Sequence, residues 1–354
     1  KKYMNNPTNG NSLPHDSVRK LALDREGNLW VATLSGLARY VEKTDSFVVY
    51  NKQNSALQND DILTLALNEN DQLLLADEKN LYLYDQKTDT FIIKESSGLS
   101  IPPEIKFIFS EQDKTWIGSM GHGIFILDNN TNHLYDLKQE NPWGVTLNAT
   151  LLYDLLKIDQ TYWLATNEGV YAFDSQSQTL SSFNTHSSPA IVGDEVRSIS
   201  QDHLGRLWFG TTTGISIYNL NKNNVFSFSD KNNLNFGLEN GYILKIFKDS
   251  KDTIWLGTYS GGVYKHNPKA AYINLFPKTI KGNLGTGNIW AIDQDNSGRI
   301  WLATQSNGLS LFDPYDYSFK HYLQDADKFK HNIWNLLVDA QNRIWVASSG
   351  GLFI

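Results

Sequence analysis

The stretch GRLWFGTTTGI at residues 205–215 decides the fold, because its pattern of an anchor tryptophan, a small residue, a polar turn and a glycine recurs along the chain. The anchor positions recur about every 45 residues, a period typical of propeller blades and of HEAT-type helical repeats. The other seven copies are GNLWVATLSGL (27–37), DQLLLADEKNL (71–81), DKTWIGSMGHGI (113–124), TYWLATNEGV (161–170), DTIWLGTYSGGV (252–263), GRIWLATQSNGL (298–309) and NRIWVASSGGL (342–352).

The residue types within each unit decide between propeller blades and helical repeats. Each unit begins with a short apolar alternation, as at residues 196–199, and continues into a turn, as at 202–205, where Asp caps the turn and Gly supplies a positive φ. After the run around the tryptophan and a polar turn, a third strand (215–218) and a fourth (226–228) complete the unit. The pattern predicts four antiparallel strands joined by hairpins in each unit.

Four such strands cannot bury both faces alone, so successive sheets must pack radially, with the tryptophan filling the space between neighbours. We predict an all-β fold, a β-propeller of four-stranded antiparallel blades in which residues 1–354 form a single domain. Residues 1–4 are expected to supply the outer strand of the last blade, so that pairing of the N- and C-terminal strands closes the fold. This count favours eight blades, with seven as the alternative. The second unit is the weakest, because Leu74 replaces the tryptophan.

Composition excludes several classes of function. The formal net charge is −7 and no basic block occurs, so we expect no nucleic-acid partner. The chain has no cysteine, which removes disulfides, thiol catalysis and cysteine-ligated metals. No apolar run reaches the length of about 18 residues that a membrane span needs, so membrane attachment is expected only through segments outside this chain. The abrupt ending GGLFI suggests a piece of a longer polypeptide.

No set of catalytic or metal-binding residues stands out. The eight histidines form no HExxH or other closely spaced metal pair, and the repeated turn aspartates fit turn caps better than calcium ligands. His122, in the turn at residues 121–123, and His331, just before an inner strand, could face the central channel. The Gly-rich residues 118–123 open no helix, so we expect no phosphate site there. We therefore predict no cofactor, no metal and no catalytic residue.

The second residue of each inner strand is the main candidate for ligand contact. In a propeller, the starts of the inner strands and the turns between second and third strands gather at one face, where recognition concentrates. The flanking positions are apolar, but this position holds Arg19, Leu63, Lys106, Tyr153, Arg197, Leu244, Trp290 and Trp334. Aromatic faces beside cationic donors suit a sugar or another planar or anionic ligand. The predicted ligand-binding residues are Arg19, Tyr153, Arg197, Trp290, Trp334, His122, Tyr259, Gln305 and Asn307. The alternative for the two tryptophans is that they fill space between blades.

The unit resembles the two-component regulator propeller repeat. That pattern consists of DxxGxxW followed by an apolar residue, Gly or Ala, Thr and a later Gly. It is most complete at residues 202–215, 295–309 and 24–37. Units two, three and four depart from it, since they lack the turn Asp–Gly pair or the Trp. The resemblance implies the periplasmic sensing portion of a bacterial signalling protein, with glycans as one ligand class. It also implies that a transmembrane helix and a histidine kinase, response-regulator or diguanylate cyclase output lie outside this chain.

Three hypotheses for function are open at this point. The first is a ligand-sensing or interaction propeller with a small-molecule or oligosaccharide ligand. The second is a propeller enzyme, a polysaccharide or lactone lyase or hydrolase, in which changes at His122 or His331 would abolish turnover. The third is a purely structural propeller that forms a homodimer.

Overall fold

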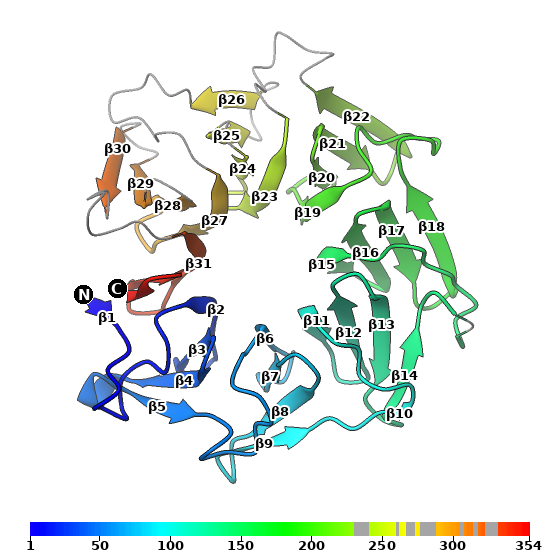
Figure 1. The fold of residues 1–354 in the computed structure, drawn as a ribbon. Coiled ribbons are helices and arrows are strands. Elements are labelled where there is room, and N and C mark those ends of the chain that lie inside the picture. The colour runs from blue at the N-terminus through cyan, green and yellow to red at the C-terminus, as the bar shows by residue number, and fades with distance from the viewer. Residues whose placement is uncertain are drawn as a thin grey trace. The chain divides into compact units, whose positions relative to one another are not determined.

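The computed structural model describes residues 1–139, 141–229, 241–259, 262–266, 273–276, 288–304, 308–313, 318–322 and 332–354. In these residues the strands form eight sheets, the blades of an eight-bladed β-propeller fold (Figure 1). The all-β prediction and the count of eight are confirmed, and the alternative of seven is wrong. The chain divides into two compact units, unit 1 with Lys1–Leu151 and Trp334–Ile354 and unit 2 with Leu152–Ile333. That residues 1–354 form a single domain stays a prediction. No helix in the described residues is long and apolar enough to cross a membrane.

Unit 1 contains four sheets. The first three have the strands β2 (Val18–Leu23), β3 (Leu29–Thr33), β4 (Gly36–Val41) and β5 (Ser46–Tyr50); β6 (Thr64–Leu67), β7 (Leu73–Ala76), β8 (Leu81–Asp85) and β9 (Thr90–Ile93); and β11 (Ile105–Ser110), β12 (Lys114–Ser119), β13 (Gly123–Asp128) and β14 (His133–Asp136). The third sheet gains a fifth strand that was not expected, because β10 (Ser97–Gly98) pairs in parallel with β14. The fourth has β31 (Ile333–Val338), β32 (Ile344–Ser348), β33 (Gly351–Phe353) and β1 (Lys2–Tyr3).

Unit 2 contains the other four sheets, each a four-stranded antiparallel meander. They are β15 (Leu152–Ile158), β16 (Thr161–Thr166), β17 (Gly169–Asp174) and β18 (Thr179–Phe183); β19 (Val196–Gln201), β20 (Leu207–Thr211), β21 (Gly214–Asn219) and β22 (Asn224–Ser229); β23 (Ile243–Lys248), β24 (Ile254–Thr258), β25 (Val263–His266) and β26 (Ile273–Phe276); and β27 (Ile289–Gln294), β28 (Ile300–Thr304), β29 (Leu309–Asp313) and β30 (Ser318–Tyr322).

The two ends of the chain meet in one sheet. Strand β1 pairs antiparallel with β33, with Lys2 opposite Phe353, and the amino group of Lys1 donates to the carbonyl of Ile354 at 2.6 Å. The pairing supplies the outer strand that the last blade otherwise lacks, so the backbone groups of β33 on that side are bonded. The predicted pairing of the N- and C-terminal strands is therefore confirmed (Figure 1).

The apolar core lies between consecutive sheets within each unit. The second strand of a blade is almost entirely buried, and β3 and β20 are buried along their whole length. In unit 2, Trp208 packs with Ile246 and Leu256 of the following sheet. Close packing of this kind explains why the anchor position takes the largest side chain. The fully buried anchors are Trp30, Trp116, Trp208, Trp255 and Trp345.

Five of the turn aspartates also hold a tryptophan, a contact that the sequence analysis missed. Asp202 Oδ1 accepts the backbone N–H of Arg206 at 2.9 Å, and Oδ2 accepts the indole N–H of Trp208 at 2.9 Å. Burial alone would raise the pKa of Asp202, but the bonds from Trp208 and Arg206 outweigh burial and hold that pKa below its usual value. Turn capping is thus the role the structure shows for these aspartates. The same indole bond occurs in the pairs Trp30–Asp24, Trp255–Asp249, Trp301–Asp295 and Trp345–Asp339.

Candidate functional site

In the described residues, the first strands of six sheets carry a β-bulge at their second residue. In the first sheet Val18 pairs with Thr33 and Lys20 with Ala32, so Arg19 is an extra residue in the ladder. A bulge leaves the extra residue unpaired and re-aims its side chain. This explains why polar and aromatic residues are tolerated at a position with apolar neighbours. The other bulged residues are Lys106, Tyr153, Arg197, Leu244 and Trp290.

In unit 2 the bulges bring predicted site residues together. The first strands β15, β19 and β23 are neighbours, and the Arg197 guanidinium lies 4.1 Å from the ring centroid of Tyr153 and 5.8 Å from that of Tyr242. Tyr242 immediately precedes β23 and stacks on Tyr259, with ring centroids 5.2 Å apart and planes 22° apart. Tyr259 is 47% exposed. We call Tyr153, Arg197, Tyr242 and Tyr259 the tyrosine–arginine surface.

A carboxylate that the sequence analysis missed fixes this arrangement. Glu195 Oε1 accepts the Tyr153 hydroxyl at 2.8 Å and forms an ion pair with Arg197 Nη2 at 2.5 Å. Burial is the largest cause, and the bond to Glu195 the next, of a Tyr153 pKa far above its usual value. The hydroxyl therefore keeps its proton and donates a hydrogen bond to Glu195. One carboxylate therefore sets the position of a ring and a guanidinium at once. The signal in the sequence is an acidic residue immediately before the first strand.

Unit 1 has a related contact at its first bulge. Arg19 Nη2 lies 2.9 Å from Asp61 Oδ2, and Asp61 comes just before the first strand of the next sheet. Lys106, at the bulge of the third sheet, has a pKa lowered by burial and by the charge of Arg19. Arg19 is therefore held by a carboxylate, as Arg197 is in unit 2.

The remaining predicted residues lie elsewhere. His122 is exposed in the turn between β12 and β13, and Trp334, the second residue of β31, is 39% exposed. Trp290 is partly buried at the bulge of β27. The structure thus brings Tyr153, Arg197 and Tyr259 together and places Trp290 on another sheet of the same unit, while Arg19, His122 and Trp334 belong to unit 1. Gln305 and Asn307, with His331, lie outside the described residues. Within those residues no group of three or more His, Asp or Glu side chains is arranged to hold a metal ion.

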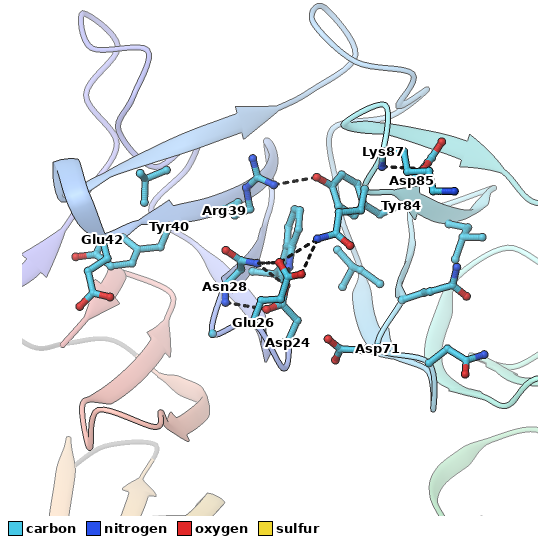
Figure 2. A pocket seen from close by; sticks show the side chains of 18 of the residues that line it. Asp24, Glu26, Asn28, Arg39, Tyr40, Glu42, Asp71, Tyr84, Asp85 and Lys87 are labelled. Atoms are coloured by element: carbon cyan, nitrogen blue, oxygen red, sulfur yellow. Dashed lines mark hydrogen bonds between the residues drawn. The ribbon is translucent and has the colours of Figure 1, made fainter.

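A cleft of about 990 Å³ lies in unit 1 between the first and second sheets. It is bounded by the turns that follow β2 and β6, so it lies at the opposite end of the first strands from the bulges. Figure 2 shows Arg39 pointing toward Tyr84, and Glu26 beside Asn28 and Asp24. The sequence analysis did not predict this cleft.

Hydrogen bonds join the two walls of the cleft. Gln86 Nε2 donates to both carboxylate oxygens of Glu26 at 2.9 Å. Arg39 Nη1 donates to the Tyr84 hydroxyl at 2.9 Å (Figure 2). The Arg39 guanidinium also lies 5.4 Å from the Trp30 ring. Many of the polar side chains that line the cleft are therefore already bonded across it, from one sheet to the other. The cleft is the second candidate site.

The family model of the two component regulator propeller matches residues 12–35, 190–213, 237–260 and 283–306. No curated protein sequence matches at a significant level. Among solved structures, the chain is similar to the extracellular domain of a putative hybrid two component system from B. thetaiotaomicron, with a TM-score of 0.54 and 16% identity over 96% of this chain and 57% of that one. It is also similar to the computationally designed Ika8 protein (TM-score 0.64, 10% identity, 97% of each chain) and to U3-55K (TM-score 0.53, 11% identity, 81% and 88%). Identities this low show a shared fold alone, and the chain spans little more than half of the B. thetaiotaomicron domain.

Proposed function

The chain carries repeats of the two-component regulator propeller family, and from this premise we propose that it is the ligand-sensing region of a bacterial two-component-type receptor, located in the periplasm. Membrane attachment and the catalytic output belong to segments outside these residues, and this region itself catalyses no reaction. The shared fold with an extracellular domain of a hybrid two component system supports the proposal.

The observation that carries the proposal is the tyrosine–arginine surface. Its side chains stand at bulges and strand ends, where they can vary without disturbing the packing between sheets. The Tyr259 ring, backed by Tyr242, presents a flat face, and Arg197, whose guanidinium lies 5.8 Å from the Tyr242 ring, adds hydrogen-bond donors to the same surface. A sugar ring has an apolar C–H face that packs on an aromatic ring and hydroxyls that accept from a guanidinium. We therefore propose oligosaccharides as the ligand class.

Replacing Tyr259 by alanine is expected to weaken oligosaccharide binding about tenfold, because a lost aromatic contact of about 1.4 kcal/mol corresponds to that factor. The measurement is a titration calorimetry series with plant and host oligosaccharides on the purified chain. Phe226→Ala is the matched control, since Phe226 is 54% exposed on β22 of the same unit but outside the tyrosine–arginine surface. We expect it to bind as the parent chain does.

Two outcomes would contradict this assignment. If none of the oligosaccharides binds the parent chain, carbohydrate sensing by this region is wrong. If Asp71→Ala, which changes the wall of the cleft, removes binding while Tyr259→Ala leaves it intact, the ligand occupies the cleft in unit 1 and not the tyrosine–arginine surface.

A further inference from the structure

Acidic residues stand before the first strands of three sheets. Glu104 and Glu195 directly precede β11 and β19, and Asp61 lies three residues before β6. We call Asp61, Glu104 and Glu195 the rim acids. Asp61 follows Arg19 by 42 residues, and Glu195 follows Tyr153 by the same 42 residues, so the two contacts occupy equivalent places in the repeat. The relation therefore recurs in both units and is not an accident of one loop.

Both arginines at the bulges are held by a rim acid. The Arg19–Asp61 distance is 2.9 Å and the Arg197–Glu195 distance is 2.5 Å. All four side chains are about one-third exposed, so the pairs lie at the surface and within reach of a ligand. A carboxylate therefore balances the positive charge of each arginine at the surface that a ligand would contact.

The balance determines which ligands the surface attracts. Near a protein surface, unlike charges about 4 Å apart attract each other and like charges repel each other, by an amount that salt reduces. An anion at that distance from Arg197 also lies close to Glu195, and repulsion from the carboxylate cancels most of the attraction. A neutral ligand keeps its ring stacking and its hydrogen bonds, because these do not depend on net charge.

We infer that Glu195 is a specificity-determining residue, which makes the tyrosine–arginine surface select uncharged ligands and reject anionic ones. The inference rests on the proposed function for the location of the ligand. It goes further in naming the charge of that ligand and the residue that sets it. The sequence left open a sugar or another planar or anionic ligand, and the inference selects the uncharged one.

The test is Glu195→Gln, which keeps an oxygen to accept the Tyr153 hydroxyl but removes the charge. With inorganic sulfate as the probe, titration calorimetry should show at least a tenfold gain in affinity over the parent chain. The matched control is Glu168→Gln, because Glu168 is an exposed carboxylate in the turn after β16, at the same end of the sheets as the bulges. The Glu168→Gln variant loses the same charge, but the ion pair of Arg197 is with Glu195 and not with Glu168. The affinity of this variant for sulfate should stay at the parent level. Adding Arg197→Gln to Glu195→Gln should remove the gain.

The outcomes separate the inference from the proposed function. If Glu195→Gln gains no sulfate affinity, or if Glu168→Gln gains as much, the inference is wrong, whatever the chain does with oligosaccharides. If Glu195→Gln gains sulfate binding while the parent chain binds no oligosaccharide, the inference holds and carbohydrate sensing fails. Should Glu195→Gln not fold, Glu195→Ala makes the same test, because it also removes the carboxylate beside Arg197; the same gain is expected, and its absence overturns the inference.

Discussion

Replacing Trp208 by alanine is expected to lower the free energy of unfolding by about 3–5 kcal/mol, the usual cost of truncating a large buried aromatic residue. Trp208 has no exposed surface and packs with Ile243 and Tyr264 of the next sheet. Its removal opens a cavity between two blades and leaves the Asp202 carboxylate without its indole donor. Urea denaturation followed by circular dichroism measures the loss as a shift of the midpoint at constant slope.

The control for this prediction is Trp334→Ala, which removes the same side chain from a position that is 39% exposed. We expect a loss of less than about 1 kcal/mol, since exposed positions away from packed sites change stability little. Equal losses for the two variants would show that the anchor tryptophans do not carry the packing between sheets. A large loss at Trp334 alone would make that residue structural filler, the alternative that the sequence left open.

The blades were predictable because their signals are local and repeated. The tryptophan period, the Asp–Gly turns and the alternating strands each specify one hairpin, and eight copies remove the ambiguity of any one. Pairing of β1 with β33 was also predictable, since the last copy lacked an outer strand. The parallel strand β10 was not, because two residues, Ser97 and Gly98, carry no strand pattern and pair only where the chain crosses to the next sheet.

The candidate site was predictable by position but not by contact. Counting along the repeats singled out Tyr153 and Arg197, and the bulge gives the physical reason for that position. The bond between Glu195 and Tyr153 depends on how adjacent sheets are offset, which no single repeat encodes, whereas Arg197 is only two residues from Glu195 along the chain. The cleft depends on the same offset, because Gln86 and Glu26 lie 60 residues apart and belong to turns of different sheets.

Replacing Asp202 by asparagine is expected to lower the free energy of unfolding by about 2–3 kcal/mol at pH 7, because buried donors lose a charged acceptor. Asp202 is 4% exposed and accepts bonds from Arg206 and Trp208. Its native pKa lies below that of the unfolded chain, about 3.9 for an aspartate. The stabilisation from its charge is therefore complete above that pH and is lost as the pH falls below it, through the native pKa. The parent chain and the variant should differ fully at pH 7 and less as the solution is acidified below this value.

The matched control is Asp252→Asn, since Asp252 is a turn aspartate whose ion pair with Lys248 joins two side chains that are 51% and 41% exposed. We expect a change within about 0.5 kcal/mol at every pH, as for other surface substitutions. Guanidinium denaturation of the three proteins between neutral and acid pH gives the comparison. A difference between the parent chain and Asp202→Asn that does not shrink in acid would mean that the Asp202 carboxylate acts through its shape alone. The recurrence of aspartate six residues before five of the anchor tryptophans would then need another cause than its charge.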